Sequence, residues 1–258
     1  MPKVHPTACV DTSAELHDAV EVGAFAIIGP QVQIGEGSQI HPFAQVLGRT
    51  TLGAHNVVHS HCVIGGPPQD KKYKGEPTQL VIGSRNTFRE CCTVNLGTVQ
   101  DRGVTEVGDD NWIMAYVHIA HDCRVGSNTI MANAVQLAGH VQVGDWAILG
   151  GITGVHQFVR VGAHAMTGAG TTLIQDLPPY VMATGNPASP HGINVEGLKR
   201  RGFSEEDIQA LRRAYKQVYK SGSTLAEALA ALAPEASERP ALGLLHQFLS
   251  SPGRGIVR

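Results

Sequence analysis

Aromatic residues are scarce in this chain, and long apolar runs are missing. Only 5% of the 258 residues are Phe, Trp or Tyr, so any core must be built from smaller aliphatic side chains. No stretch approaches the about 20 apolar residues that a membrane-spanning helix needs, and the N-terminus has no apolar segment of signal-peptide length. We therefore expect a cytoplasmic protein with no stable membrane insertion.

A strong charge of either sign is also absent. The formal net charge is −2, which provides no general basic field, so we expect no nucleic acid partner. The five cysteines form no CxxC pair and no even disulfide framework. This usage suits a reducing compartment in which small thiols fill the core.

An aliphatic residue recurs at every sixth position through most of the chain. One run extends from Val4 to Ile64, and a second, out of phase with the first, extends from Val107 to Leu173 with a slip at Thr167. A helix period of 3.6 does not explain this pattern, whereas a multiple of two keeps the marked residues on one face of a strand. The pattern predicts a β-solenoid in which three hexads close a triangular coil, stacked at about 4.8 Å. A β-sandwich, the alternative, would show strands of varied length and irregular turns.

Two breaks and a change of composition set the domain organisation. Residues 1–184 are predicted to form the β-helix, with projecting loops at about 65–80 and 95–106, and residues 185–258 a C-terminal helical domain. Ser204 with Asp207 resembles an N-terminal cap of a first helix. Thr224 with Glu227 resembles a capping box for a second, to about Ala233. A third is expected over about 238–250.

Stacking arithmetic predicts the candidate site, because residues 18 apart lie above one another. His121 lies under Gly139, which lies under Gln157, and Asp122 lies under His140. A neutral imidazole can take a proton from a hydroxyl, and an unobstructed glycine N–H can hold an oxyanion. Asp122 could orient the imidazole only if the backbone bends there, since neighbouring strand residues point to opposite faces. His118 and His156 lie nearby.

Other readings of the same residues stay open at this point. A single histidine in a repeat is usually a surface residue, and only the clustering favours catalysis. With His118, His121 and His140 as zinc ligands, the groove would instead resemble a carbonic anhydrase site. The glycines around Ala169 and at Gly150-Gly151 look like nucleotide loops but fall at coil corners without a strand-to-helix crossover, which favours a structural role.

Four segments carry a family resemblance over essentially the whole chain: HIAHDCRVG at 118–126, LAGHVQVGD at 137–145, GVHQFVRVGAHAM at 154–166 and GINVEGLKRRGFS at 192–204. The chain resembles the UDP-N-acetylglucosamine O-acyltransferases of lipid A biosynthesis. The resemblance implies a left-handed parallel β-helix of hexapeptide repeats, a homotrimer with sites between subunits, and no metal or redox cofactor. It also implies transfer of a 3-hydroxyacyl chain from acyl carrier protein to the 3-hydroxyl of the sugar nucleotide.

The resemblance also assigns roles. His121 would be the general base and Gly139 the oxyanion donor. Substrate contacts would come from Gln69, Asp70 and Lys72 on the first loop, and from His118, His140, His156 and Gln157 around the sugar and acyl chain. The uridine diphosphate would contact Asn194, Glu196, Arg200 and Arg201, although the last two are equally explained as a solvated cluster before a helix.

Two departures from the family pattern matter. Asn95-Leu96-Gly97-Thr98 stands where relatives commonly read His-Arg-Gly-Thr, and Ala169 stands at the position that limits acyl length, where glycine allows a longer chain. Ala169 therefore predicts a somewhat shortened hydroxyacyl donor. Two alternatives remain. The related N-acyltransferase has an extra N-terminal uridine-binding domain, for which we expect no room before Val4. A non-catalytic structural solenoid would show regular rows of threonine instead of a histidine groove.

Overall fold

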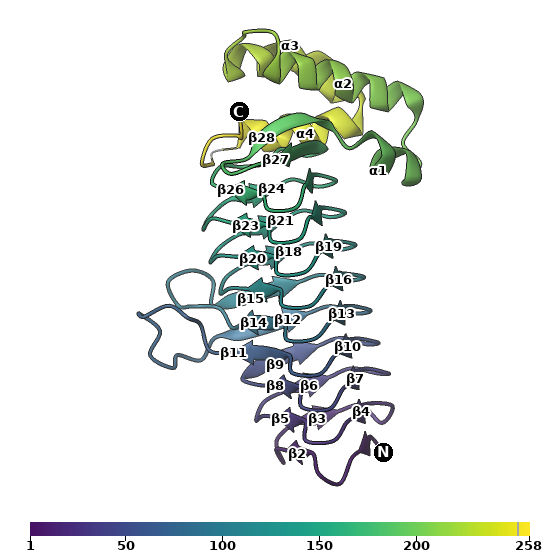
Figure 1. The fold of residues 1–258 in the computed structure, drawn as a ribbon, viewed down its shortest axis with the longest axis vertical. Helices are drawn as coiled ribbons and strands as arrows, with labels where there is room; N and C mark the ends of the chain where they lie inside the picture. The colour runs from purple at the N-terminus through teal and green to yellow at the C-terminus, as the bar shows by residue number, and fades with distance from the viewer. Residues whose placement is uncertain (252) are drawn as a thin grey trace.

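The structure, a computed structural model, describes residues 1–251 and 253–258 and consists of a three-sided β-prism capped by helices (Figure 1). Its three sheets, which we name A, B and C, contain 11, 9 and 8 strands. Consecutive strands of the prism belong to consecutive sheets, so each coil visits A, B and C in turn. The predicted parallel β-helix is confirmed.

The strands are short, mostly two residues long. Sheet A contains β1 (Lys3–Val4), β4 (Glu21–Val22), β7 (Gln39–Ile40), β10 (Val57–Val58), β13 (Thr87–Phe88), β16 (Trp112–Ile113), β19 (Ile130–Met131), β22 (Ile148–Leu149), β25 (Met166–Thr167), β27 (Val181–Thr184) and β28 (Ser189–Ile193). Sheet B contains β2 (Cys9–Val10), β5 (Ile27–Ile28), β8 (Gln45–Val46), β11 (Val63–Gly66), β14 (Thr93–Asn95), β17 (His118–Ile119), β20 (Gln136–Leu137), β23 (Gly154–Val155) and β26 (Thr172–Leu173). Sheet C contains β3 (Glu15–Leu16), β6 (Gln33–Ile34), β9 (Arg49–Leu52), β12 (Gln79–Ile82), β15 (Val104–Val107), β18 (Arg124–Val125), β21 (Gln142–Val143) and β24 (Arg160–Val161).

The second residue of each two-residue strand points into the prism, which explains the period of six. Ile119 pairs in parallel register with Leu137, and Leu137 with Val155, each 18 residues on. All three are buried. A narrow core of this kind is filled by stacked aliphatic side chains, and aromatic rings are excluded from most of it because they are too wide.

The corners between sheets turn through a residue with positive φ. At the corner between sheets B and C, which we call the B/C corner, Asp122, His140 and Phe158 have φ of 59°, 63° and 65°. Non-glycine residues seldom adopt this left-handed conformation, and here the hydrogen bonds between coils impose it. The A/B and C/A corners are built in the same way.

Both projecting loops leave the B/C corner. The first connects β11 to β12 and the second connects β14 to β15, and together they form the side projection in Figure 1. We call them flap 1 (residues 67–78) and flap 2 (residues 96–103). They therefore lie beside the corner on which the sequence places the candidate site.

Four helices follow the last coil: α1 (Val195–Arg200), α2 (Glu205–Tyr219), α3 (Leu225–Glu238) and α4 (Pro240–Ser250). Ser204 accepts a hydrogen bond from the Asp207 N–H, and Thr224 forms the expected capping box with Glu227. None of the helices in residues 1–251 and 253–258 is long and apolar enough to cross a membrane.

The helical region differs from the sequence prediction in three details. The helix predicted to stop near Ala233 continues to Glu238 across Pro234, because Arg239 N–H bonds to the Glu235 carbonyl and the ladder resumes. The following helix begins at Pro240, a favoured first position. The six-residue α1 was not predicted, since it is too short to show a helical period.

An antiparallel hairpin, β27 with β28, joins the prism to the helices. Above it, apolar side chains form a second core that includes Tyr180, Leu198, Ile208, Leu211 and Leu245. This cluster seals the end of the prism.

Candidate active site

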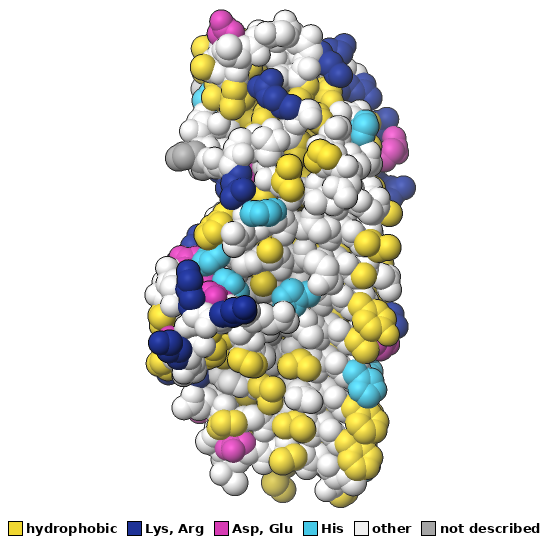
Figure 2. Space-filling view, turned by 60° about the vertical axis from the view of Figure 1, so that its left-hand side comes forward, with side chains coloured by type: hydrophobic (Ala, Val, Ile, Leu, Met, Phe, Trp, Pro, Cys, Tyr) yellow, Lys and Arg dark blue, Asp and Glu magenta, His cyan; other side chains and the backbone are white. Residues whose placement is uncertain are grey.

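A pocket of about 1040 Å³ opens at the B/C corner between the two flaps and the upper part of sheet C. Histidine and basic side chains gather beside the flaps on this face of the molecule (Figure 2). The lining residues are Gln69, Asp70, Lys72, Gln100, Asp101, His118, Ala120, His121, Asp122, Arg124, His140, Gln142, Gln157, Phe158, Arg160, Gly253 and Arg254.

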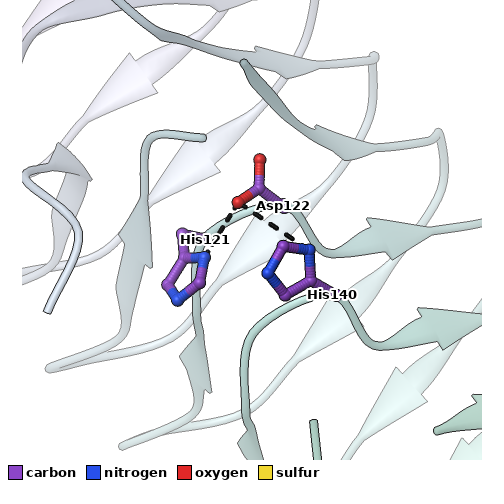
Figure 3. A group of neighbouring side chains, drawn as sticks. All are labelled: His121, Asp122 and His140. Atoms are coloured by element: carbon purple, nitrogen blue, oxygen red, sulfur yellow. Dashed lines mark hydrogen bonds and ion pairs between the residues drawn. The ribbon is translucent and has the colours of Figure 1, made fainter. Parts of the chain in front are cut away.

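His121 is held by its neighbour in the chain. Its Nδ1 lies 2.8 Å from Oδ2 of Asp122, and its side chain is 15% exposed (Figure 3). The positive φ of Asp122 supplies the bend that this contact requires. Because Asp122 is a carboxylate acceptor, Nδ1 carries the proton and Nε2 carries the lone pair.

Flap 2 and its root hold Asp122 in turn. The Thr98 N–H donates to Oδ1 at 2.9 Å and the Thr98 hydroxyl to Oδ2 at 2.6 Å, while the Asp122 N–H donates to the Thr105 hydroxyl. Burial alone would raise the pKa of Asp122, but the hydrogen bonds from His121 and Thr98 outweigh it and hold the pKa below its ordinary value. Asp122 is therefore ionised at neutral pH.

Gly139 packs directly on the His121 imidazole. A Cβ at this position would lie 2.5 Å from Cε1 and 2.7 Å from Nε2 of His121. Among the described residues, no backbone or side-chain acceptor receives the Gly139 N–H. An imidazole and an unused backbone donor thus lie in one column, as the 18-residue stacking predicts.

His140 connects the same corner to the tip of flap 2. Its Nδ1 lies 3.0 Å from Asp101 and 3.9 Å from Asp122, and its ring meets the His121 ring edge-on at 5.1 Å. On its other side the ring stacks on Phe158 at 4.3 Å. The ring orientation is therefore fixed.

The other predicted residues of this group divide between pocket and surface. His118 lines the pocket and its Nδ1 lies 2.7 Å from the Thr93 hydroxyl; burial, with a smaller effect of the His121 charge, lowers its pKa. Gln157 also lines the pocket. His156 is exposed and its Nδ1 bonds the Gln157 carbonyl, so its side chain lies beside the pocket and not in its wall.

Flap 1 contributes Gln69, Asp70 and Lys72 to the pocket wall. Asp70 accepts a hydrogen bond from the Lys72 N–H at 3.0 Å, which fixes the turn that carries both side chains. All three side chains line the space that a ligand would occupy beside flap 1.

The predicted diphosphate residues lie elsewhere in the chain. Asn194 is the buried N-cap of α1, and Arg201 lies 3.3 Å from Nδ1 of His164 at the C/A corner, with its guanidinium 5.3 Å from the Trp146 ring centroid. Glu196 and Arg200 are exposed on α1. None of the four is among the described residues that line the pocket.

Ala169 is also outside that wall. It lies exposed at the A/B corner between β25 and β26, beside Gly170, whose N–H bonds the Gly151 carbonyl. The His121 imidazole, the residues predicted to bind the diphosphate and the position predicted to limit acyl length therefore lie at three different corners of one chain.

Several wall residues were missed from the sequence. Arg124, Gln142 and Arg160 are successive rungs of sheet C, 18 residues apart, and Phe158 lies 18 residues above His140, so the stacking rule contains the signal for all four. Gln100, Asp101 and Arg254 come from a flap and from the C-terminal segment, which obey no repeat.

The cluster of His121, Asp122 and His140 has donor atoms within 4.8 Å of one another, a spacing that a metal ion can bridge. Here Oδ2 of Asp122 already accepts from His121 and Thr98, and Nδ1 of His140 is bonded to Asp101. His118, the third ligand in the zinc alternative, has its Nδ1 bonded to Thr93. Hydrogen bonds account for these side chains, and we assign them as a hydrogen-bonded group.

A hexapeptide-repeat prism with a carboxylate-held histidine under a free glycine N–H defines the class of hexapeptide acyltransferases. Family models agree: a bacterial transferase hexapeptide model matches residues 31–66 and 105–139, and the second-domain model of UDP-N-acetylglucosamine O-acyltransferase matches residues 176–257. The chain belongs to the acyl-[acyl-carrier-protein]–UDP-N-acetylglucosamine O-acyltransferase family, as its curated relatives show.

Those relatives match over their full length. The enzyme of that name from Thiobacillus denitrificans is 57% identical over 258 residues, and that from Verminephrobacter eiseniae 55% over 262 residues, each with 100% of both chains covered. A solved structure of the Acinetobacter baumannii protein has a TM-score of 0.96 at 45% identity and covers 99% of each chain. The Francisella novicida UDP-N-acetylglucosamine acyltransferase has a TM-score of 0.97 at 40% identity, covering 99% of this chain and 94% of that one. The β-helix is left-handed, as the resemblance implied.

Proposed function

We propose that this protein transfers a 3-hydroxyacyl chain from acyl carrier protein to the 3-hydroxyl of UDP-N-acetylglucosamine, the first step of lipid A biosynthesis. The names of its full-length relatives support the reaction. The single structural observation that carries it is the packing of the His121 imidazole against Gly139 in an open pocket, with Nδ1 tied to Asp122.

His121 acts as general base. Asp122 holds the proton on Nδ1, so the Nε2 lone pair takes the proton of the sugar hydroxyl as its oxygen attacks the thioester carbonyl carbon. The Gly139 N–H stabilises the oxyanion, and one such donor contributes on the order of 3 kcal/mol. When the tetrahedral intermediate collapses, the C–S bond breaks and the carrier thiolate takes the proton from Nε2. The base is then neutral again.

The remaining wall residues bind the two substrates. His118, His140 and Gln157, with His156 at the rim, surround the sugar and acyl chain, and Gln69, Asp70 and Lys72 close over them from flap 1. Asn194, Glu196, Arg200 and Arg201 hold the uridine diphosphate. No metal or redox cofactor takes part in the proposed mechanism.

We further propose a homotrimer, and two features support it. The imidazole and the proposed diphosphate residues lie on different corners of one prism, so a neighbouring copy must complete each site. A column of exposed rings along the A/B edge, visible in Figure 2, provides apolar surface for packing: Phe25 stacks on Phe43 at 5.2 Å, and Tyr116 is 63% exposed.

Mixed trimers test this arrangement. His121→Ala and Arg201→Ala homotrimers should each be inactive, whereas trimers reassembled from both should regain activity, because some sites then combine an intact base with an intact diphosphate group. Mixtures with no regained activity would count against shared sites. Light scattering gives the oligomeric state directly.

Two finer features belong to the same proposal. Ala169 limits the acyl chain, so a panel of carrier thioesters should give a maximum at a shortened chain, and a maximum at the longest common chain would contradict this role. The proposal places the reaction in the cytoplasm, because the five cysteines, all unpaired, suit that reducing compartment.

The overall function is tested by incubating the protein with UDP-N-acetylglucosamine and 3-hydroxyacyl carrier protein. Formation of a 3-O-ester is the expected result. An amide product would favour the N-acyltransferase, and no product with a folded protein would favour a structural solenoid.

A further inference from the structure

Arg124 brings an unpaired positive charge to the pocket wall. It is half-buried on β18, and among the described residues its guanidinium has no carboxylate within 4.0 Å and no hydrogen-bond acceptor. Arg160, two rungs above, is fully paired: its Nε and Nη2 both lie 2.8 Å from Oδ2 of the buried Asp176. Both arginines line the pocket, but of the two only the Arg124 guanidinium is without a carboxylate partner among the described residues.

The natural partner of Arg124 is engaged elsewhere. Glu106 lies directly below Arg124 in the register of sheet C, but both of its carboxylate oxygens bind the guanidinium of Arg102 from flap 2. The rung above Arg124 is the neutral Gln142. The sequence thus places a carboxylate beside Arg124 and then neutralises it with a second arginine, which leaves the Arg124 charge without a partner among the described residues.

The position of this charge identifies its ligand class. Arg124 follows His121 by three residues, so its backbone lies within about 10 Å of the base. Guanidinium groups pair with phosphate oxygens through two parallel hydrogen bonds, and a half-buried site strengthens that attraction. We propose that Arg124 is a phosphate-binding residue of the His121 pocket, a role that rests on the proposed acyl transfer.

Both proposed substrates can supply the phosphate. One source is the diphosphate of the nucleotide sugar, and the other is the phosphodiester of the phosphopantetheine arm of the carrier protein. The ligand chemistry is the same in the two cases, and the kinetics separate them, because each substrate can be varied while the other is saturating.

The test compares Arg124→Gln and Arg124→Lys with Arg85→Gln as the control. Arg85 is exposed at the C/A corner and paired with Asp110, outside the pocket. We expect Arg124→Gln to raise KM for one of the two substrates about tenfold to a hundredfold with kcat within about threefold, and Arg124→Lys to lie between it and the wild type. The substrate whose KM rises is the one that supplies the phosphate.

A second pair of variants uses the neighbouring carboxylate. Arg102→Gln frees Glu106 to pair with Arg124, so it should raise the same KM, and adding Glu106→Gln should restore it. A structural effect of Arg102 on flap 2 would not be reversed by the second change, and that result would count against the proposal.

Calorimetry with UDP and with pantetheine 4′-phosphate, on wild type and Arg124→Gln, separates this inference from the proposed function. If the wild type forms no ester, the proposed function fails, yet weaker binding of either probe to Arg124→Gln still supports a phosphate contact. Unchanged KM values together with unchanged probe binding would overturn it. So would a fall in kcat alone, equal rises in both KM values, or a melting temperature lowered relative to Arg85→Gln.

Discussion

The C/A and B/C corners of this prism have the same backbone conformation, but their backbone N–H donors have different partners. The second residue of each corner has an N–H that points along the prism toward the next coil. At the C/A corner, side chains of the next coil accept it: Ala54 donates to Ser84, Ser84 to Asp109, Asp109 to Ser127 and Ser127 to Asp145. At the B/C corner the equivalent Gly139 N–H has no acceptor among the described residues.

The buried side chains inside the two corners also differ, being polar at the C/A corner and apolar at the B/C corner. Inside the C/A corner a ladder of buried polar side chains saturates its own hydrogen bonds, with Asn111 donating to the Gly126 carbonyl and accepting from Thr129. Inside the B/C corner the corresponding residues are Cys123, Val141 and Val159, and the polar groups face outward. The C/A corner uses four successive donors within the protein, which is typical of a structural role, whereas the B/C corner leaves the Gly139 N–H available to a ligand.

Removing the general base should have the largest effect on activity. His121→Ala eliminates the only group of the B/C corner that we assign to proton transfer, so we expect kcat to fall about 10³-fold, with melting temperature and oligomeric state unchanged. The matched change at the C/A corner, His55→Ala, should leave kcat as it is. Residual activity within tenfold of wild type for His121→Ala would refute the assignment.

Filling the free donor site should have the next largest effect. Gly139→Ala places a methyl carbon 2.5 Å from Cε1 of His121, so the ring must move and the approach to the N–H is obstructed. We expect kcat to fall about a hundredfold, since small displacements of a catalytic group have effects of this size. Gly154→Ala is the control, because a Cβ there meets nothing within 4 Å. Equal kcat values for the two variants would contradict the role of Gly139.

The proximity of His121 and Gly139 could be predicted from the sequence, because in this repeat residues 18 positions apart lie next to each other in adjacent coils. The period of six fixes which residues point inward, and 18-residue stacking then places Gly139 over His121 without coordinates. The support of Asp122 by Thr98 could not be predicted in this way, since flap 2 interrupts the repeat and its closure depends on tertiary contacts.

In the helical region, local helix starts could be predicted from the sequence but their packing on the prism could not. Caps at Ser204 and Thr224 are local signals, so both helix starts were predicted correctly. The location of Arg201 at the C/A corner, away from His121, depends on how the β27–β28 hairpin and α1 fold back on the prism. No periodicity encodes that packing.

Breaking the structural corner should affect stability and spare chemistry. Asn111→Ala leaves the Gly126 carbonyl and the Thr129 N–H buried without partners, so the free energy of unfolding should fall by about 2 kcal/mol. With protein that is still folded, kcat should stay within about twofold of wild type. Denaturant titration and steady-state kinetics on the same preparation measure both, and a large kcat effect with little loss of stability would erase the distinction between the corners.

The smallest effect concerns the charges that face histidine at each corner. His121 meets a carboxylate, whereas His164 at the C/A corner meets Arg201; burial first, and then the Arg201 charge, lowers the pKa of His164 to about 4. A histidine in the unfolded chain titrates near 6.5. Between these values the unfolded state binds a proton that the folded state does not, so stability should decline as pH falls from about 6.5 to about 4 and level off below. His164→Phe keeps a ring between Trp146 and Tyr180 and should flatten this decline, measured by denaturant titration at each pH, whereas Tyr180→Phe, which keeps the histidine, should not. An unchanged slope in His164→Phe would show that the proton released on folding comes from another group, and the electrostatic contrast between the two corners would then be lost.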